Sequence, residues 1–173
     1  MDVEDLTRAL AKDLDGSFPD LVKAMEDQLY SGLRRMTGDS ADAEDLTQET
    51  LIRAYRALSS YGPGRIEELK LRGWMWTIAL NLGRNHLRDR ARRPVPVAEV
   101  DGTVVEDPPT SGGDWDRRLQ KLSRDQRRAV VLRHVVDLDY EEISAATGRP
   151  LGTVKNDVHR GLERLRRIME DEE

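Results

Sequence analysis

The chain has 173 residues, of which 38% are hydrophobic and 35% charged, so it allows one or two domains with small cores. The absence of cysteine excludes disulfides and thiolate metal sites. No apolar run approaches about 18 residues and the N-terminus lacks a basic-then-apolar signal, so we expect a cytoplasmic protein without direct membrane insertion.

The net charge is −5, but the charges are segregated along the chain. Residues 1–64 and 94–116 are acidic, whereas residues 65–93 carry eight basic and three acidic side chains. Residues 117–169 carry thirteen basic and seven acidic side chains. Two separate basic blocks predict two surfaces that contact nucleic acid, although basic helices can also be ordinary solvated faces.

The first part of the chain predicts two long helices after an N-terminal extension at residues 1–17. The apolar residues of the first helix follow helical spacing: Phe18, Leu21, Val22, Met25, Leu29, Leu33 and Met36. The second helix runs over about 42–60 and is expected to bury Leu46, Leu51 or Ile52, Tyr55 and Leu58. Glycine breaks the chain between the helices at residue 38, and residues 61–64 (YGPG) predict a loop.

A third helix is predicted from about Trp74 to Arg92. Its polar face carries Thr77, Asn81, Arg84, Asn85, Arg88 and Arg92, and its opposite face carries Trp74, Met75, Ile78, Ala79 and Leu82. Arginine neutralises phosphates and asparagine can bind a base edge, whereas mid-helix asparagine costs helix propensity. The polar face therefore favours DNA binding over an ordinary solvated surface. We expect Trp74 in the core and leave Trp76 open.

Residues 94–114 predict an extended, flexible linker, because they include four prolines and three glycines and lack basic residues. A short hairpin of the valines in this segment is the alternative. Helical sequence resumes at Trp115. Ser123 and Gln126 have the spacing of a capping box. The helix that they begin carries Ala129, Val130, Leu132 and Val136.

Residues 140–167 predict a helix-turn-helix. Asp139 and Glu142 have capping-box spacing before the first helix, and Gly148-Arg149-Pro150 ends it. The second helix spaces its apolar residues by three and four: Leu151, Val154, Val158, Leu162, Leu165 and Met169. Its outward residues are Lys155, Asn156, His159, Arg160 and Arg166, which suit a major groove. The alternative is a three-helix bundle whose last helix is merely solvated.

No strand pattern or internal repeat is evident. The predicted fold is therefore all-α, with two small helical domains over residues 18–93 and 115–173 joined by the linker. The second domain contains the helix-turn-helix.

Three segments of the chain resemble a known family. The segments are DAEDLTQETLIRAYRAL (42–58), GWMWTIALNLGRNHLRDRARR (73–93) and residues 122–165, which contain the helix-turn-helix. In this order they resemble a bacterial sigma factor of the extracytoplasmic-function group, which keeps only regions two and four. The resemblance implies a protein that is not an enzyme and needs no cofactor. Such a protein binds core RNA polymerase, directs it to promoter DNA and helps to open the −10 element.

The resemblance also implies roles for residues of the N-terminal domain. Asp45, Gln48 and Glu49 would face the clamp helices of the largest polymerase subunit; from the residues alone, a solvated acidic helix start is equally compatible. The loop over residues 60–72 would capture a base flipped out of the −10 element. Asn81 would help to read that element, and Arg84, Asn85 and Arg88 would follow its backbone.

In the C-terminal domain, the resemblance assigns contacts with the −35 duplex to Lys155, Asn156, His159 and Arg160, with Arg133 as a backbone contact. Asp157 stands where many relatives have a basic residue, which leaves the −35 preference open. The acidic linker would thread the polymerase cleft, although from composition alone a flexible spacer fits equally. The flap of the second-largest subunit and an anti-sigma factor are further partners that the resemblance implies.

Two other classes of protein remain open. A helix-turn-helix regulator without polymerase affinity would leave residues 42–58 unexplained, and a sigma-like interaction module would keep the helices but lose initiation activity. No nucleophile–base pair or metal constellation indicates an enzyme. His159 lacks companions at ligand spacing, because the other histidines are His86 and His134.

Overall fold

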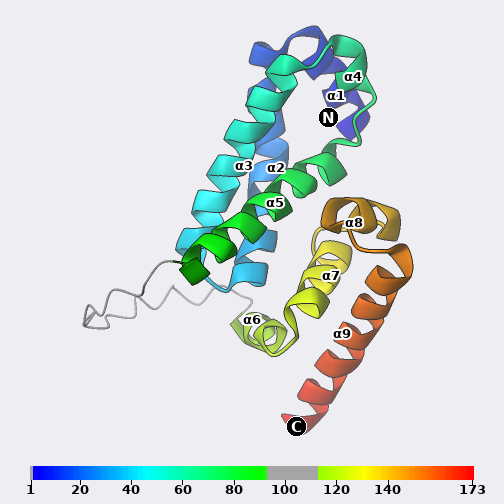
Figure 1. Cartoon of the computed structure of the whole chain (residues 1–173). Helices are drawn as coiled ribbons and strands as arrows, with labels where there is room; N and C mark the ends of the chain where they lie inside the picture. The colour runs from blue at the N-terminus through cyan, green and yellow to red at the C-terminus, as the bar shows by residue number, and fades with distance from the viewer. Residues whose placement is uncertain (1, 93–112) are drawn as a thin grey trace, which may run out of the picture.

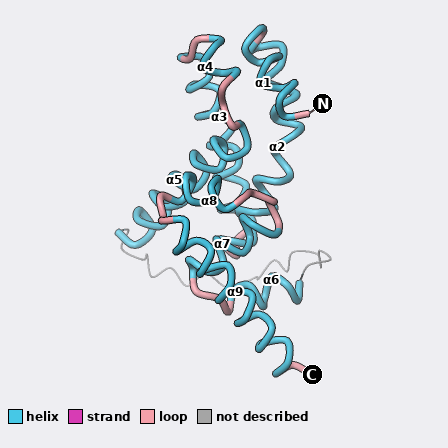
Figure 2. Tube along the Cα trace, turned by 90° about the vertical axis from the view of Figure 1, so that its right-hand side faces the viewer, coloured by secondary structure: helices cyan, strands magenta, loops and turns pink. Residues whose placement is uncertain are grey.

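The computed structural model describes residues 2–92 and 113–173, and all regular structure within these ranges is helical (Figures 1 and 2). The N-terminal domain comprises α1 (Val3–Lys12), α2 (Leu14–Thr37), α3 (Ser40–Ser60), α4 (Pro63–Glu67) and α5 (Leu71–Arg92). The C-terminal domain comprises α6 (Gly113–Gln120), α7 (Arg124–His134), α8 (Tyr140–Thr147) and α9 (Leu151–Asp171). The predicted all-α class is confirmed. The predicted linker lies outside the described residues except for its last two, which begin α6.

Local sequence signals set many of the helix ends. Both predicted capping boxes form: Ser123 with Gln126 begins α7, and Asp139 with Glu142 begins α8. Gly38 and Gly148 follow the C-termini of α2 and α8 with φ of 71° and 70°, which glycine adopts without strain. Asp39 caps α3 by accepting a hydrogen bond from the Asp42 N–H at 2.9 Å.

The core of the N-terminal domain forms where α2 packs along α3 and α5 crosses α3 (Figure 1). The apolar face predicted for α2 is buried at its centre, through Leu21, Met25, Leu29 and Leu33. On α3, Leu46 and Leu58 are buried, and the choice between Leu51 and Ile52 falls on Leu51, because Ile52 is 46% exposed.

Residues 2–17 are part of the folded domain rather than a separate extension. They supply α1 and the beginning of α2, and α1 packs against α4 at the end of the domain farthest from the C-terminus (Figure 1). The loop predicted at residues 61–64 is partly wrong, because Pro63 and Gly64 begin α4. Both helices are short, so neither gives a long periodic signal in the sequence.

The prediction that Trp74 lies in the core is only partly right, and Trp76, whose burial the sequence left open, lies in the core. Trp76 is fully buried, whereas Trp74 is only partly buried. The helix also begins at Leu71, three residues before the predicted boundary. It packs against α3 on one side and α8 on another. Because α5 has two partners, its buried residues cover more than the single face that the spacing predicts.

In the C-terminal domain, the predicted core residues Ala129, Val130, Leu132 and Val136 are all buried. The predicted apolar face of α9 is only half right. Val154, Val158 and Leu165 are buried, but the outer residues of the predicted stripe are exposed: Leu151, Leu162 and Met169. Gly161 and Ile168 complete the buried face instead. A Cβ at Gly161 would lie 2.6 Å from Val130 Cγ2, so glycine permits the close approach of α7 and α9.

The two domains contact each other through α2 and α5 on one side and α6, α7 and α8 on the other. At the centre, the indole of Trp76 covers Gly32: a Cβ there would lie 2.5 Å from Trp76 Cη2 and 3.2 Å from Val136 Cγ2. The Val136 carbonyl accepts hydrogen bonds from Gln28 Nε2, at 3.2 Å, and from Arg72. A buried apolar contact is thus surrounded by bonds from side chains to backbone.

Replacing Trp76 with alanine should lower the free energy of unfolding by about 3–5 kcal/mol, because it empties the largest fully buried side-chain site. Trp74→Ala is the matched control and should cost clearly less, because the Trp74 ring is only partly buried. Urea unfolding of the full chain, followed by circular dichroism, measures both losses. Equal losses would contradict the assignment of Trp76 to the core.

Candidate nucleic-acid interface

The polar residues predicted on the third helix lie together on the outside of α5. Asn81, Arg84, Asn85 and Arg88 are all exposed. Arg84 is the one among them that reaches the other domain, where its Nη2 donates to the Thr147 carbonyl at 3.4 Å. The amide and guanidinium groups of this face are therefore available to solvent along about two turns of helix.

A hollow of about 240 Å³ lies beside this face, between the end of α3 and α5. It is lined by Arg53, Ala57, Tyr61, Trp74, Ile78, Asn81, Leu82 and Asn85. The Tyr61 and Trp74 rings stand 6.1 Å apart at an angle of 59°, and the Arg65 guanidinium lies 3.7 Å from the centre of the Tyr61 ring. The sequence identified Asn81 but missed Tyr61, because the grouping depends on a contact between separate elements.

A second groove, of about 530 Å³, brings the predicted polymerase-binding residues against α5. Its lining consists of Asp45, Leu46, Gln48, Glu49, Ile52, Arg53, Leu82, Asn85, His86 and Asp89. Asp45 and Gln48 are exposed, and Glu49 pairs with Arg53 at 3.0 Å. Ile52 adds an exposed apolar side chain to this acidic surface, a feature that the predicted set lacks.

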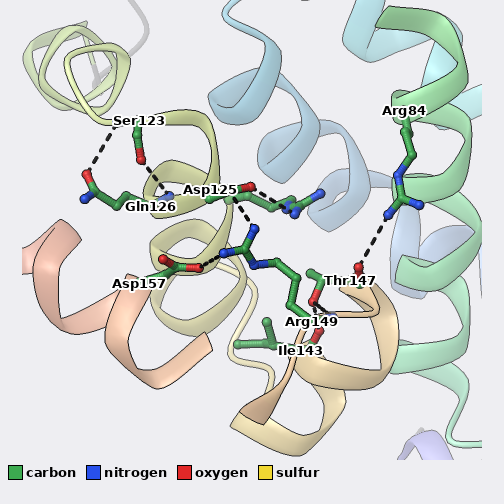
Figure 3. A network of polar contacts seen from close by, with 9 residues as sticks. Arg84, Ser123, Asp125, Gln126, Ile143, Thr147, Arg149 and Asp157 are labelled. Atoms are coloured by element: carbon green, nitrogen blue, oxygen red, sulfur yellow. Dashed lines mark hydrogen bonds and ion pairs between the residues drawn. The ribbon is translucent and has the colours of Figure 1, made fainter. Parts of the chain in front are cut away.

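In the C-terminal domain, the turn between α8 and α9 is held by a polar network centred on Arg149 (Figure 3). The Arg149 guanidinium pairs with Asp125 of α7 at 2.7 Å and with Asp157 of α9 at 3.0 Å. Ser144 Oγ donates to the Arg149 carbonyl at 2.6 Å. The network thus ties three helices to one turn and fixes the direction in which α9 leaves it.

Asp157 faces this network rather than the outer side of α9. Its side chain is 16% exposed and lies toward Arg149 (Figure 3). The Asp157 carboxylate is therefore neutralised within the protein by Arg149. Its position removes the repulsion that it would exert on DNA phosphates from the outer face.

The outward side of α9 carries the predicted −35 residues in the exposed positions: Lys155, Asn156, His159 and Arg160. Lys155 Nζ lies 5.8 Å from the centre of the Tyr140 ring, and His159 Nε2 lies 3.5 Å from Glu163 Oε1. Arg133 is less available, because it pairs with Asp137 at 3.3 Å and lies 5.4 Å from the centre of the Tyr140 ring.

Arginines from both domains line a cavity of about 420 Å³ between them: Arg84, Arg124, Arg128 and Arg149. Burial lowers the pKa of Arg128, and repulsion from the other three arginines lowers it further, whereas Asp125 raises it. Arg84 of the N-terminal domain thus faces three arginines of the C-terminal domain, two of which pair with Asp125.

Within residues 2–92 and 113–173, no cluster of three or more histidine, aspartate or glutamate side chains could hold a metal ion. The described helices also include none that is both long and apolar enough to cross a membrane.

Two family models match the chain, Sigma-70 region 2 over residues 21–93 and Sigma-70, region 4 over residues 113–165. The ECF RNA polymerase sigma factor SigW of Bacillus subtilis is 31% identical over 172 residues, covering 90% of this chain and 90% of that protein. The RNA polymerase sigma-E factor of Streptomyces avermitilis is 33% identical over 156 residues, covering 88% and 85%. This chain belongs to the ECF RNA polymerase sigma factors.

A third ECF relative, SigE of Mycolicibacterium smegmatis, is 38% identical over 160 residues, which cover 87% of this chain and 60% of that protein. A solved structure of the sigma factor RpoE in complex with the anti-sigma factor NepR, from Bartonella quintana, has a TM-score of 0.72 and 26% identity. The match covers 88% of this chain and 96% of that one. Sigma factors serve transcription and are not themselves enzymes, so the family agrees with the implied class.

Asp157→Ala in this ECF sigma factor should lower the free energy of unfolding by about 1–3 kcal/mol, because it leaves the half-buried Arg149 with one carboxylate instead of two. Glu163→Ala removes an exposed carboxylate from the same helix and should change stability by less than about 0.5 kcal/mol. Thermal unfolding of both variants tests the difference. If Asp157→Ala is neutral, the network does not hold the turn.

Proposed function

We propose that this chain binds core RNA polymerase and directs it to promoters, with the N-terminal domain opening the −10 element and the C-terminal domain reading the −35 element as duplex. The observation that carries the proposal is the pair of exposed helix faces, on α5 and α9, rich in arginine, lysine and asparagine. They lie in the two regions that match sigma-70 models. Such side chains supply both phosphate neutralisation and base-edge contacts.

At the −10 element, the hollow beside Asn81 is suited to a base taken out of the stack. Tyr61 and Trp74 offer aromatic surface, Asn81 offers an amide to the base edge, and Arg65 adds positive charge near the Tyr61 ring. Unstacking costs a few kcal/mol, and stacking on an aromatic ring returns about 1–3 kcal/mol per base. Arg84, Asn85 and Arg88 continue along the same face toward the backbone of the strand.

At the −35 element, α9 would enter the major groove with Lys155, Asn156, His159 and Arg160 outward. Asp157 is held by Arg149, so this face is basic and amidic without an opposing carboxylate at its centre. Arg133 would contact the backbone by exchanging Asp137 for a phosphate, a replacement of one charged partner by another.

Two surfaces are suited to the polymerase. The groove with Asp45, Gln48, Glu49 and the exposed Ile52 would receive the clamp helices of the largest subunit. A separate hollow of about 350 Å³ on the C-terminal domain is lined by Trp115, Leu162, Leu165, Arg166, Met169, Glu170 and Glu173. Its exposed tryptophan, leucine and methionine would receive an apolar segment of the flap of the second-largest subunit.

An anti-sigma factor is the further partner that we propose, since the RpoE structure is a complex with the anti-sigma factor NepR. Its contact with both domains of this chain would keep them from the polymerase. Because RNA polymerase is the proposed partner, the cytoplasm is the proposed site of action.

Run-off transcription on fragmented genomic DNA from the source organism, with core polymerase in the presence and absence of this protein, tests the proposal. We expect discrete starts, each preceded by shared −35 and −10 elements. Stable binding to core without such starts would favour an interaction module. Specific DNA binding without any affinity for core would favour a helix-turn-helix regulator.

Asn81→Ala and Asn156→Ala form a matched pair, because each removes one exposed amide from a different DNA-facing helix. We expect Asn81→Ala to abolish discrimination against base changes in the −10 element and Asn156→Ala to do so in the −35 element. Each loss should amount to about 1–3 kcal/mol, or about 5- to 150-fold in the ratio of initiation rates. Transcription from templates with single-base changes measures it, and loss of discrimination at the opposite element would refute the assignment.

Lys155→Ala should reduce the slope of log binding constant against log salt concentration by about 1, because one phosphate contact is lost. The isolated −35 duplex is titrated with holoenzyme at several salt concentrations. Arg8→Ala, which removes an exposed charge from α1, is the control and should leave the slope unchanged. An unchanged slope for Lys155→Ala would place this side chain away from the phosphates.

A further inference from the structure

The helix α1 precedes the segment that matches sigma-70 region 2, which begins at residue 21, yet it is firmly built into the domain. Leu6 and Leu10 are 3% and 1% exposed, and Thr7 is buried between them. Asp13 accepts from the Gly16 N–H at 3.1 Å and so caps α2 directly after α1 ends. Ser17 Oγ donates back to the Ala9 carbonyl at 3.0 Å. The position of α1 is therefore fixed relative to α2.

The helix α1 packs against α2 and also against α4, which lies in the loop proposed to handle the −10 element. With five residues, α4 is far shorter than a helix that is stable by itself. Glycines stand on both sides of Pro63, at positions 62 and 64, so the local backbone is otherwise permissive. Ile66, 3% exposed, anchors α4 in the common buried core, which also includes Leu6 and Leu10, and α4 packs against α1 there. Packing against α1 thus supplies the order that α4 lacks on its own.

The position of α4 bears directly on the hollow beside Asn81. Arg65 belongs to α4, and its guanidinium lies 3.7 Å from the centre of the Tyr61 ring. Tyr61 in turn stands against Trp74, and both rings line the hollow. A shift of α4 would move Arg65 and the Tyr61 backbone, and with them the aromatic wall that faces Asn81.

We propose that α1 is a positioning element for the −10 site: Leu6 and Leu10 hold α4 so that Tyr61 and Arg65 are preset to receive an unstacked base. This inference rests on the proposed function of the hollow. Neither leucine touches the DNA. The benefit is preorganisation, because ordering the loop before binding removes that entropic cost from base capture.

A role confined to general stability is the alternative, and it predicts a different pattern. Any buried leucine of the N-terminal core would then be equivalent. Leu29 of α2 is the matched comparison: it is fully buried like Leu10, but its helix packs mainly against α3 and α1 and makes no substantial contact with α4. Leu10→Ala and Leu29→Ala therefore remove the same atoms from two places in one core.

The test measures how strongly holoenzyme prefers a single-stranded oligonucleotide with the −10 sequence found by run-off mapping over one with an abasic site at the flipped position. We expect Leu10→Ala to reduce this preference at least tenfold, and Leu29→Ala to leave it within twofold of the wild type. Leu10→Met should restore most of it. Leu10→Val serves if the alanine variant does not fold, with a smaller loss in the same direction.

Hydrogen exchange on the free chain provides the second measurement. Amides of residues 65–69 should exchange at least tenfold faster in Leu10→Ala than in Leu29→Ala, because α4 loses its packing partner in the first variant only. Equal preference for the base in Leu10→Ala and wild type, or equal losses in the two alanine variants, would overturn the proposal. If wild-type holoenzyme does not prefer the −10 oligonucleotide over the one with an abasic site, the hollow does not bind a base. In that case the proposed function of the hollow is wrong, and the proposed role of α1 is wrong as well.

Discussion

The packing of Trp76 over Gly32 is the contact on which the arrangement of the molecule depends. The indole occupies space that any side chain at Gly32 would fill, which brings α5 against α2. Val136 meets the same glycine from the C-terminal domain, so one buried cluster orients both domains. With Trp76 and Met75 turned inward, Asn81, Arg84, Asn85 and Arg88 are left on the outside of α5. The chemistry of the exposed face is thus a consequence of how its opposite side is buried.

The contact between the domains uses groups that have other partners in the proposed function. Arg84 donates to the carbonyl at the end of α8, and the same guanidinium lies on the face proposed to follow the −10 strand. Around the intervening cavity Arg84 faces three arginines of the other domain, and Asp125 offsets part of their mutual repulsion by pairing with Arg128 and Arg149. The rim also holds opposite charges, because Asp116 of α6 pairs with Arg34 and Arg35 of α2 at 3.1 and 3.6 Å. An interface with one apolar centre and a polar, charged rim is more easily exchanged for another partner than a fully apolar one.

The sequence predicts the class of fold and most helices because periodicity and caps are local signals. The sequence predicts burial poorly where a side chain is covered by separate helices, or where a glycine lets two helices approach closely. Trp76 is buried because it packs over Gly32 of α2 beside Val136 of the other domain, a contact that the periodicity of α5 alone cannot represent. Gly161 has no side chain, so it adds nothing to the apolar pattern of α9. It nevertheless lets α7 approach closely and turns α9 so that Leu162 is exposed. The short helices α1 and α4 stabilise each other, and neither has a pattern long enough to predict it alone.

For the candidate site, the sequence predicts which side chains are exposed, but it does not predict which side chains pair with one another. Lys155, Asn156, His159 and Arg160 lie outward as the helical spacing requires, because that spacing is a property of one helix. Asp157, adjacent in sequence, lies inward against Arg149, a residue of the turn that is itself held by α7. Whether a carboxylate on a DNA-facing helix repels phosphates or orients the helix therefore depends on a side chain eight positions earlier. In this chain Asp157 orients the helix, because its pair with Arg149 stabilises the turn without placing negative charge on the outer face.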